Sequence, residues 1–489
     1  NTKEIQRKYK GHTKENEANT KETQRKYEGN YRDGRKHGSW KFFTYDGELL
    51  EEGDYRHGHK DGPWVAYHYF GQPRVEGDYR DGKEEGLWVS YHYNGQIRKN
   101  GAFKNGLKEG PWVTYARMDT LRSPKQLLGP ALGLPSLTFR AWFAAQYGEA
   151  AWERLEKIPR FVWMEYLIWY RRTLSIPVEN AVSVNNILPD GDLLKLTLSG
   201  PGADENEIWA RRVVLATGRE GLGQPMLPKF VNMVPRACWA HSSEDIDFAT
   251  LKGKRVTVIG AGASAVENAA EALEAGAAEV RLLARREVMP QINKMMGIGS
   301  PGLVAGFPAL SDEWRWRYLH YNNVVQTPAP RGSTLRVSRH ENGFFHFGVT
   351  ISHVNVTADG LLLTTTKGRF LETDFIILGT GFDTDPMKQP VLEGYADNIL
   401  QWRHRYTAPA GLEDESLGSF PYLNSDFSFR ERDVGATPWV TKIHCFNYGS
   451  KMTLGNVSGD IPAISEGATW LAREVAAKFY GEDIEYHWQ

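Results

Sequence analysis

Residues 255–265 read Arg-Val-Thr-Val-Ile-Gly-Ala-Gly-Ala-Ser-Ala, and this stretch decides the fold. Its first five residues predict a buried strand, and the apolar spacing after the glycines predicts a helix. Gly260 permits a sharp turn, Gly262 lets the backbone approach a pyrophosphate, and Ala265 still allows the helix to pack closely on the strand. Because a helix N-terminus offers free N–H groups, we expect a dinucleotide-binding turn here. The alternative is a Rossmann-like unit whose turn holds no ligand.

The strand after this turn indicates which dinucleotide would bind. Residues 279–283 form a second apolar strand, which ends in Ala284-Arg285-Arg286. An NAD site would offer an acidic residue at this point for the ribose 2′-hydroxyl, whereas two guanidinium groups suit a 2′-phosphate. The sequence therefore predicts NADPH, with Arg285 and Arg286 as binding residues, unless both arginines are merely solvated.

A second glycine motif, Gly-Ile-Gly-Ser-Pro-Gly at residues 297–302, has a different context. Residues 291–296 do not form an apolar strand, and Pro301 and Pro308 argue against an ordinary helix after the motif. We expect a loop over the nucleotide cleft rather than a second nucleotide turn.

Two similar β-meanders flank the nucleotide-binding segment. Their strands are expected at residues 182–184, 193–198, 212–216, 349–354, 361–366 and 375–378. The first meander ends in Ala216-Thr217-Gly218 and the second in Gly379-Thr380-Gly381. Small residues at such points allow the backbone to come close to another group. The pattern implies two dinucleotide-binding units, of which only one has its glycine fingerprint.

Upstream of the first meander, two helices are expected at residues 137–147 and 159–172. In the second, aromatic and apolar side chains recur at helical spacing, for example Tyr166 and Tyr170. We interpret this aromatic face as core, with a substrate pocket as the alternative.

The N-terminal part of the chain repeats every 24 residues. The repeated tryptophans are Trp40, Trp64, Trp88 and Trp112, and one set of repeated glycines is Gly29, Gly53, Gly77 and Gly101. Alternation of bulky aromatic residues predicts strands, and the glycines predict tight turns. One repeat is therefore one β-hairpin, and the hairpins must stack because a single hairpin is marginal in water.

This pattern resembles the MORN-like repeats of YwqK-type proteins over residues 27–115. The resemblance implies a scaffold or interaction surface, because no acid, base or nucleophile recurs in the unit. The alternative is a face that binds a specific peptide or lipid, and a protein partner on the array is a hypothesis. Residues 1–28 are highly charged and are expected to be a flexible lead-in.

Composition narrows the class of protein. The chain has 489 residues, with 59 basic and 60 acidic side chains, so no overall charge favours nucleic acid or an anionic membrane. Its two cysteines have no metal-ligand spacing and favour a reducing, cytoplasmic setting, so no metal site is expected. No apolar run is long enough to span a membrane, and no signal peptide is visible.

From residue 116 onward the chain resembles the flavin-containing monooxygenases that use FAD and NADPH. The resemblance rests on the two Thr-Gly linkers, His241-Ser242-Ser243, the Gly-x-Gly-x-Ser-Ala turn and Gly459-Asp460-Ile461-Pro462, which opens a helix from about residue 465. It implies that Gly260, Gly262 and Ser264 hold NADPH, and Ala265 of the same turn is included among the expected cofactor-binding residues because of its close packing. It also implies that Thr217, Gly218, Thr380 and Gly381 form the linkers, and that Gly459 and Asp460 lie beside the flavin.

One part of that family pattern is missing. Such enzymes open with their own strand, glycine turn and helix for the FAD pyrophosphate, and no apolar strand with a glycine turn precedes Arg255. We expect a multidomain chain: a hairpin-repeat array, then an α/β two-dinucleotide-domain flavoprotein fold with an incomplete FAD half. The expected parts are a lead-in at 1–28, repeats at 29–115, an FAD-domain remnant at 116–252 with 380–489, and an NADP domain at 253–379. The join near residue 115 is interpreted as a fusion.

Two functions remain open at this point. The first is a monooxygenase that uses NADPH and FAD to insert one oxygen atom from O₂ into a small organic substrate. Its FAD site is expected to be impaired unless the repeat array or a partner chain covers the missing part. The second is a repeat-mediated interaction protein that carries a flavin-free NADP-binding relic. A flavin-free reductase is disfavoured because no proton-relay pair has an interpretable spacing. No catalytic residue is assigned, and His241, Asn447 and Lys451 are interpreted as structural polar groups.

Overall fold

The structure is a computed structural model, and it shows two compact units. It describes residues 26–44, 47–67, 73–91, 97–114, 121, 125–126, 129–130, 133–200, 202–203, 206–219, 221–294, 297, 300–459 and 461–488. The first unit comprises residues 1–176, 247–253 and 274–277, and the second comprises residues 177–246, 254–273 and 278–489. The expected lead-in up to residue 25 and the expected join at residues 115–117 lie outside the described residues.

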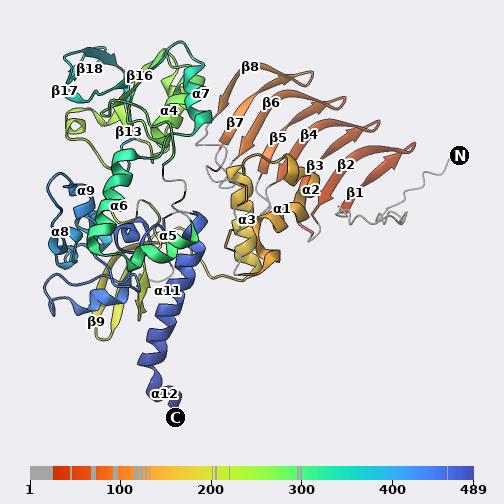
Figure 1. Cartoon of the computed structure of the whole chain (residues 1–489). Helices are drawn as coiled ribbons and strands as arrows, with labels where there is room; N and C mark the ends of the chain where they lie inside the picture. The colour runs from red at the N-terminus through yellow and green to blue at the C-terminus, as the bar shows by residue number, and fades with distance from the viewer. Residues whose placement is uncertain are drawn as a thin grey trace. The chain divides into compact units, whose positions relative to one another are not determined.

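The first unit carries an eight-stranded antiparallel sheet in which the strands pair in chain order (Figure 1). Its strands are β1(Lys26–Arg32), β2(Arg35–Phe43), β3(Leu49–Arg56), β4(His59–Tyr67), β5(Pro73–Arg80), β6(Lys83–Tyr91), β7(Ile97–Lys104) and β8(Leu107–Thr114). The β1–β2 turn, Asp33-Gly34, has two positive φ angles, as a tight hairpin turn requires. The N-terminal all-β region is therefore confirmed, and its assignment to MORN-like repeats stays a prediction.

Tryptophan rings in this sheet lie on glycines of the neighbouring strand. Trp40 pairs with Gly29 on one side and with Gly53 on the other. A Cβ atom on Gly29 would lie 2.3 Å from the Trp40 ring, and one on Gly53 would lie 2.2 Å from the Trp64 ring. Trp40 and Trp64 are accordingly buried within a single sheet. These glycines are needed for space rather than for backbone conformation.

Three helices of the first unit have an aromatic core. They are α1(Phe139–Tyr147), α2(Glu149–Arg154) and α3(Arg160–Thr173). Tyr166 is fully buried, packs edge-to-face on Phe139, and donates a hydrogen bond to the Leu137 carbonyl at 2.7 Å. The aromatic face expected on the second helix is thus part of the core.

The second unit contains a five-stranded parallel sheet in the order β13-β20-β14-β15-β16. These strands are β13(Trp239–His241), β14(Arg255–Ile259), β15(Glu279–Ala284), β16(Gly343–Phe347) and β20(Phe375–Leu378). Helix α4(Ala263–Glu274) follows β14 after the short turn predicted from the sequence. Val258, Leu282 and Ile377 are buried, as expected for a sheet covered on both faces.

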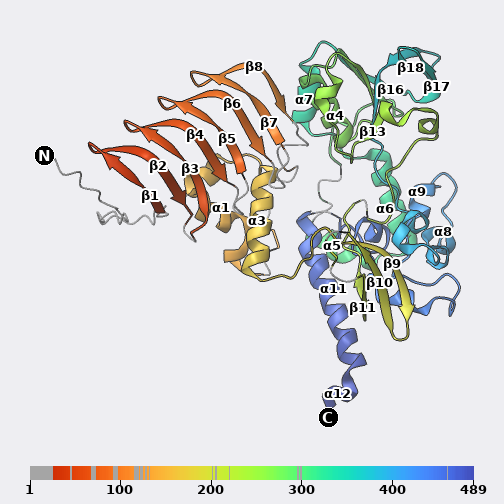
Figure 2. The same ribbon diagram turned by 180° about the vertical axis from the view of Figure 1, so that it is seen from behind.

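The two meanders differ from the prediction in their third strand. The first consists of β9(Ser183–Asp190), β10(Leu193–Ser199) and β11(Glu207–Ala210), and the second of β17(Ile351–Thr357), β18(Gly360–Thr365) and β19(Phe370–Thr373) (Figure 2). The sequence pattern places the strands that end in the Thr-Gly turns in the meanders, and this prediction is wrong. β12(Val213–Val214) instead pairs in parallel with β21(Ile443–His444), and β20 joins the parallel sheet. The apolar side chains of β20 are mostly buried, which suits its place in the parallel sheet, whereas β11 and β19 are short and partly exposed and form the outer strands of the meanders.

The second glycine motif leads into a helix, contrary to expectation. Helix α5(Pro301–Gly306) has Pro301 in its first turn, where a missing N–H is tolerated. Gly299 of the motif lies outside the described residues. No strand is described at residues 291–294, so the motif still lacks the context of a nucleotide turn.

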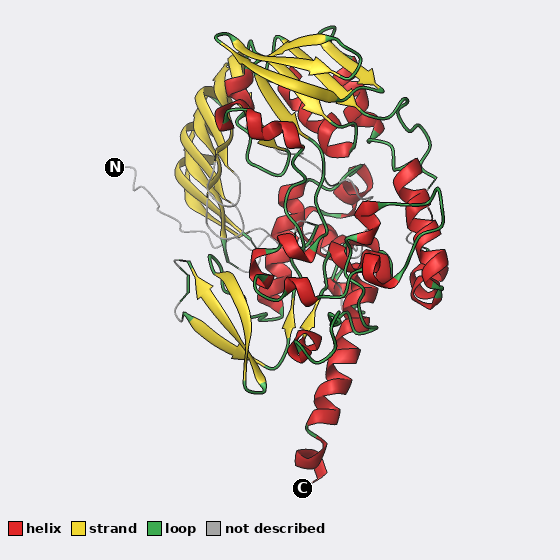
Figure 3. Cartoon of the chain, turned by 90° about the vertical axis from the view of Figure 1, so that its left-hand side faces the viewer, coloured by secondary structure: helices red, strands yellow, loops and turns green. Residues whose placement is uncertain are grey.

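The remaining helices of the second unit are α6(Asp312–Val325), α7(Arg331–Ser338), α8(Trp402–Arg405), α9(Glu415–Gly418), α10(Lys451–Leu454), α11(Ile461–Glu482) and α12(Ile484–Trp488). α11 leads to the C-terminus as a long helix (Figure 3) and begins four residues earlier than expected. None of the described helices combines the length and apolar character needed to cross a membrane.

Candidate functional site: a dinucleotide turn and two linkers

At Gly260, the glycine turn after β14 is held by contacts that leave no room for a side chain. Gly260 has a φ of +117°, which glycine adopts far more readily than other residues. A Cβ atom on Gly260 would lie 2.5 Å from the Gly379 carbonyl oxygen, and one on Gly379 would lie 2.5 Å from the Cβ of Ala265. Ala265 is fully buried. The small residue at this third position therefore allows α4 to touch the end of β20.

Gly262 has the opposite surroundings. It is exposed, and a Cβ atom placed on it would meet no described atom within 4 Å. It immediately precedes α4, whose first residues include Ser264. Open space beside a glycine at a helix N-terminus is the geometry in which backbone N–H groups approach a phosphate.

Two arginines follow the adjacent strand β15. Among the described residues, neither Arg285 nor Arg286 forms an ion pair or a side-chain hydrogen bond. Burial, and then the neighbouring charge of Arg285, lowers the pKa of Arg286. Two uncompensated guanidinium groups side by side favour an anionic ligand.

The two Thr-Gly linkers differ in their surroundings. The second runs beside residues 224–226, because Met226 N–H donates to the Gly381 carbonyl at 2.9 Å and Asp383 N–H donates to the Gln224 carbonyl at 2.9 Å. Thr380 Oγ1 donates to the Met226 carbonyl at 2.5 Å. This linker is therefore fixed against the segment that follows the first linker.

His241 supports the same linker from β13. It is fully buried, its Nε2 lies 3.1 Å from the Gly381 carbonyl oxygen, and its Nδ1 lies 2.7 Å from the Ser243 hydroxyl. Both ring nitrogens are thus used in local contacts, which fits a structural role.

The first linker is attached to the segment after β21. Asn447 is fully buried, and its side-chain amide donates to the Leu215 carbonyl and to Thr217 Oγ1, each at 3.2 Å. The backbone N–H of Tyr448 donates to the Gly218 carbonyl at 3.2 Å. Asn447 therefore holds together the carboxyl ends of the parallel strands β12 and β21.

Tyr448 lies between this linker and the start of α11. A Cβ atom on Gly459 would lie 3.0 Å from the Tyr448 ring. The Arg219 guanidinium lies 4.7 Å from the centre of the ring, and Lys451 Nζ lies 3.3 Å from the phenol oxygen. Burial raises the pKa of Tyr448, but the positive charges of Lys451 and Arg219 outweigh it and the pKa is lowered.

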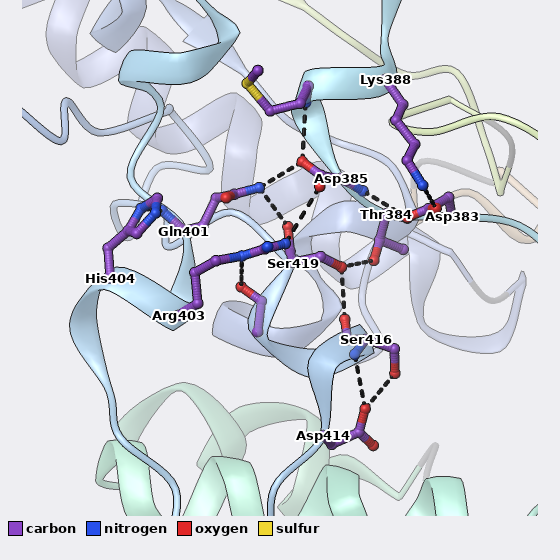
Figure 4. Close-up of polar contacts among 12 residues, drawn as sticks. Asp383, Thr384, Asp385, Lys388, Gln401, Arg403, His404, Asp414, Ser416 and Ser419 are labelled. Carbon is purple, nitrogen blue, oxygen red and sulfur yellow. Dashed lines mark hydrogen bonds and ion pairs between the residues drawn. The ribbon is translucent and has the colours of Figure 1, made fainter.

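A polar network fixes the chain beyond the second linker (Figure 4). Asp385 accepts hydrogen bonds from Gln401 at 2.7 Å and from Arg403 at 3.3 Å, and Gln401 also donates to the Ser419 carbonyl at 3.0 Å. Thr384 and Ser419 are joined through their hydroxyls at 3.2 Å. Because Gln401, Thr384 and Ser419 are buried, this network connects the linker to α8 and α9 as part of the interior.

The structure places the expected site residues in two groups. The first group surrounds the turn after β14 and comprises Gly260, Gly262, Ser264, Ala265, Thr380 and Gly381, with Arg285 and Arg286 at the end of the next strand. The second group surrounds Tyr448 and comprises Thr217, Gly218 and Gly459. Asp460 lies outside the described residues. Sequence reasoning missed Arg219 and Tyr448, although Arg219 directly follows Ala-Thr-Gly.

Comparison with known proteins shows the class of enzyme to which the chain is related. The sequence family described as L-lysine 6-monooxygenase/L-ornithine 5-monooxygenase matches residues 151–335. The FAD-dependent urate hydroxylase of Xanthomonas campestris pv. campestris is 36% identical over 373 residues, which are 75% of this chain and 77% of that protein. The L-lysine N6-monooxygenase of Escherichia coli is 27% identical over 192 residues, 38% of this chain and 43% of that protein.

Solved structures share the fold. The ornithine N-hydroxylase of Kutzneria sp. 744, a structure with reduced FAD, NADP⁺ and L-ornithine, has a TM-score of 0.56 at 18% identity and covers 75% of this chain and 88% of its own. The FAD-bound cadaverine monooxygenase of Erwinia amylovora has a TM-score of 0.54 at 16% identity, covering 74% and 85%.

The parallel sheet, the glycine turn and the paired linkers define a dinucleotide-binding flavoprotein fold. The chain belongs to the flavin-dependent monooxygenase family, among the relatives of lysine and ornithine N-monooxygenases. The resemblance noted in the sequence is confirmed at this level.

Proposed function

We propose that the chain is a monooxygenase that uses NADPH and FAD to transfer one oxygen atom from O₂ to a small organic substrate. The observation that carries the proposal is the 36% identity to a urate hydroxylase over 373 residues. A repeat-mediated interaction protein without enzymatic activity is not favoured by this relationship.

We further propose that the turn at Gly260 to Ala265 holds NADPH. The open Cβ position of Gly262 supports contact between the backbone and the pyrophosphate, and α4 directs its N-terminus there. Arg285 and Arg286 would bind the 2′-phosphate, because their charges are not compensated by a described acid. Ser264 would line the same helix start.

FAD, when bound, supplies the activation of O₂ and the oxygen transfer. The second group of residues fits one side of such a cofactor: Gly218 lies in an exposed linker with a φ of +74°, and Gly459 packs against Tyr448. A cradle for the FAD pyrophosphate is not found: no described strand before β14 runs directly through a glycine turn into an α-helix. We therefore propose that FAD binding is weaker than in a chain with both glycine turns.

The relatives named above suggest two substrate types, a purine such as urate and an amino acid such as lysine or ornithine. Both types are small molecules with a nitrogen atom. The repeat array contributes no chemistry in this proposal, and a protein partner on its surface remains a separate hypothesis.

The proposal is tested on the purified full chain by measuring bound flavin per protein after incubation with FAD, together with NADPH consumption. We expect near-equimolar flavin at high FAD and NADPH oxidation that increases when a substrate is added. NADPH binding without any retained flavin or oxidation would contradict the proposal and favour an NADP-binding relic on a repeat scaffold.

A further inference from the structure

Two cations and a phenol meet at the carboxyl ends of β12 and β21. Arg219 follows the first linker, and Tyr448 and Lys451 follow β21, so residues 219 and 448 are distant in sequence. The guanidinium of Arg219 lies 4.7 Å from the Tyr448 ring centre, and Lys451 Nζ lies 5.2 Å from it. Ligands of parallel α/β sheets bind beyond the carboxyl ends of the strands, which is where this cluster lies.

The positive charges of the cluster are not neutralised within the described part of the chain. There, the Arg219 guanidinium lies over the Tyr448 ring and the Lys451 ammonium lies near the Tyr448 ring and hydroxyl, and neither side chain forms an ion pair with an acid. Other arginines of the same unit do have such partners, for example Arg403 with Asp385 and Arg336 with Glu267. The cluster therefore provides a positive potential beside a half-buried aromatic ring.

The cluster is exposed enough to be accessible to a ligand. Arg219 is exposed in a linker whose residues 216–218 are also exposed, whereas Tyr448 and Lys451 are half-buried. A guanidinium over a ring, with no ion pair among the described residues, has N–H groups that can make a bidentate contact to an oxyanion.

We propose that Arg219, Tyr448 and Lys451 bind the substrate, and that the substrate is a planar heteroaromatic anion of the urate type. The inference rests on the proposed function, since it assigns the substrate class of that site. Lysine and ornithine carry a net positive charge at neutral pH, so two cations without an acidic partner among the described residues attract a net anion more strongly than either amino acid. A urate anion spreads its charge over ring oxygen and nitrogen atoms, which the guanidinium, ammonium and phenol can all contact.

The test is equilibrium dialysis of urate against the full chain without NADPH, for the wild type and for Arg219→Gln and Lys451→Gln. Each substitution should weaken urate binding about tenfold or more, because it removes a charge-assisted contact. Arg430→Gln is the matched control, since Arg430 also lies over a tyrosine ring, Tyr422, at 5.3 Å, and it should bind urate as the wild type does. Tyr448→Phe keeps the ring under Arg219 and should weaken binding less than Arg219→Gln.

Several results would overturn the inference: no urate binding by the wild type, unchanged binding in both cation variants, or tighter binding of L-lysine or L-ornithine than of urate. Unfolding midpoints of the variants, expected to equal that of the wild type, separate a lost contact from a lost fold. Flavin content and NADPH oxidation of the same samples report on the proposed function independently. Urate binding that depends on Arg219 in a sample without flavin turnover would refute the monooxygenase and leave the anion site in place.

Discussion

The repeated glycines of the first unit's sheet and Gly262 of the second unit have opposite surroundings. In the repeat sheet, the space above Gly29, Gly53 and Gly77 is filled by a tryptophan ring of the same chain, at 2.2 to 2.3 Å from an added Cβ. In the nucleotide turn, the space at Gly262 is not filled by any described atom within 4 Å. The comparison teaches that a packing glycine is recognised by the ring that fills its missing side chain. An open glycine needs a second feature to indicate a ligand, because turn glycines such as Gly34 are as open as Gly262, and Gly262 has the N-terminus of α4 beside it.

The turn also contains both types of glycine side by side. Gly260 is bounded by protein, because its Cβ would meet the Gly379 carbonyl, whereas Gly262 is open. Substitution at these positions should therefore separate stability from binding.

The largest effect is expected for Gly53→Ala in the sheet. Its methyl group would overlap the Trp64 ring, and overpacking of this kind should lower the free energy of unfolding by about 3 kcal/mol. Ser39→Ala, at an exposed position of β2, is the control and should change stability by less than about 0.5 kcal/mol. Denaturant unfolding followed by tryptophan fluorescence measures both, and equal stability of the two variants would refute the packing role of Gly53.

Gly260→Ala should come next. Alanine at a φ of +117° is strained and would also contact the Gly379 carbonyl, so we expect a loss of about 2 kcal/mol in unfolding free energy. Gly262→Ala should leave the unfolding free energy within about 0.5 kcal/mol of the wild type. If both variants lost stability equally, the distinction between the two glycines would be wrong.

A smaller effect concerns the choice of dinucleotide. The double variant Arg285→Gln/Arg286→Gln should weaken NADPH binding about tenfold and leave NADH binding nearly unchanged, because the two ligands differ only in the 2′-phosphate. Arg339→Gln, an exposed arginine at the end of α7, serves as the control. Calorimetric titration with both dinucleotides checks this, and equal weakening of NADPH and NADH would remove the 2′-phosphate assignment.

The smallest effect is a pH dependence of the free energy of unfolding, caused by the ion pair between Arg255 and Asp374 at the five-stranded parallel sheet. Hydrogen bonds from Arg255 lower the pKa of Asp374 below its ordinary value of 3.8. A lowered carboxyl pKa stabilises the folded state above the unfolded pKa, and this contribution is lost as the pH falls through the folded value. Asp374→Asn should therefore be less stable than the wild type by a constant amount above about pH 5, and the difference should shrink below pH 3.8.

Glu372→Gln is the control for that comparison, because Glu372 contacts the same arginine but its side chain is 70% exposed. It should cost less stability than Asp374→Asn at neutral pH. A difference between the wild type and Asp374→Asn that grew on acidification would contradict the assigned direction.

Much of the fold could be predicted from the sequence because short-range residue patterns indicate many of its strands and helices. β14 was expected at residues 255–259 and is found there, since an apolar strand before a glycine turn has few other interpretations. β11 and β19 were missed because each has only four residues and a partly exposed pattern. β12 was placed in the wrong sheet because its partner, β21, lies more than 200 residues further along the chain.

The candidate site could also be predicted only where its residues are close together in the sequence. Gly260, Gly262 and Ala265 share one turn, and their spacing alone indicates their geometry. The Arg219 and Tyr448 pair could not be predicted, because only the parallel pairing of β12 and β21 brings them together. Asp460, assigned through the family resemblance, lies outside the described residues and stays a prediction.

The central claim is that the open space at Gly262 is a dinucleotide site, and calorimetric titration of NADPH into the wild type and into Gly262→Val tests it most directly. The account predicts that the wild type binds NADPH and that Gly262→Val binds it at least tenfold more weakly, about 1.4 kcal/mol, while unfolding at the same denaturant concentration. Equal affinity of the two proteins, or no NADPH binding by the wild type, would contradict it.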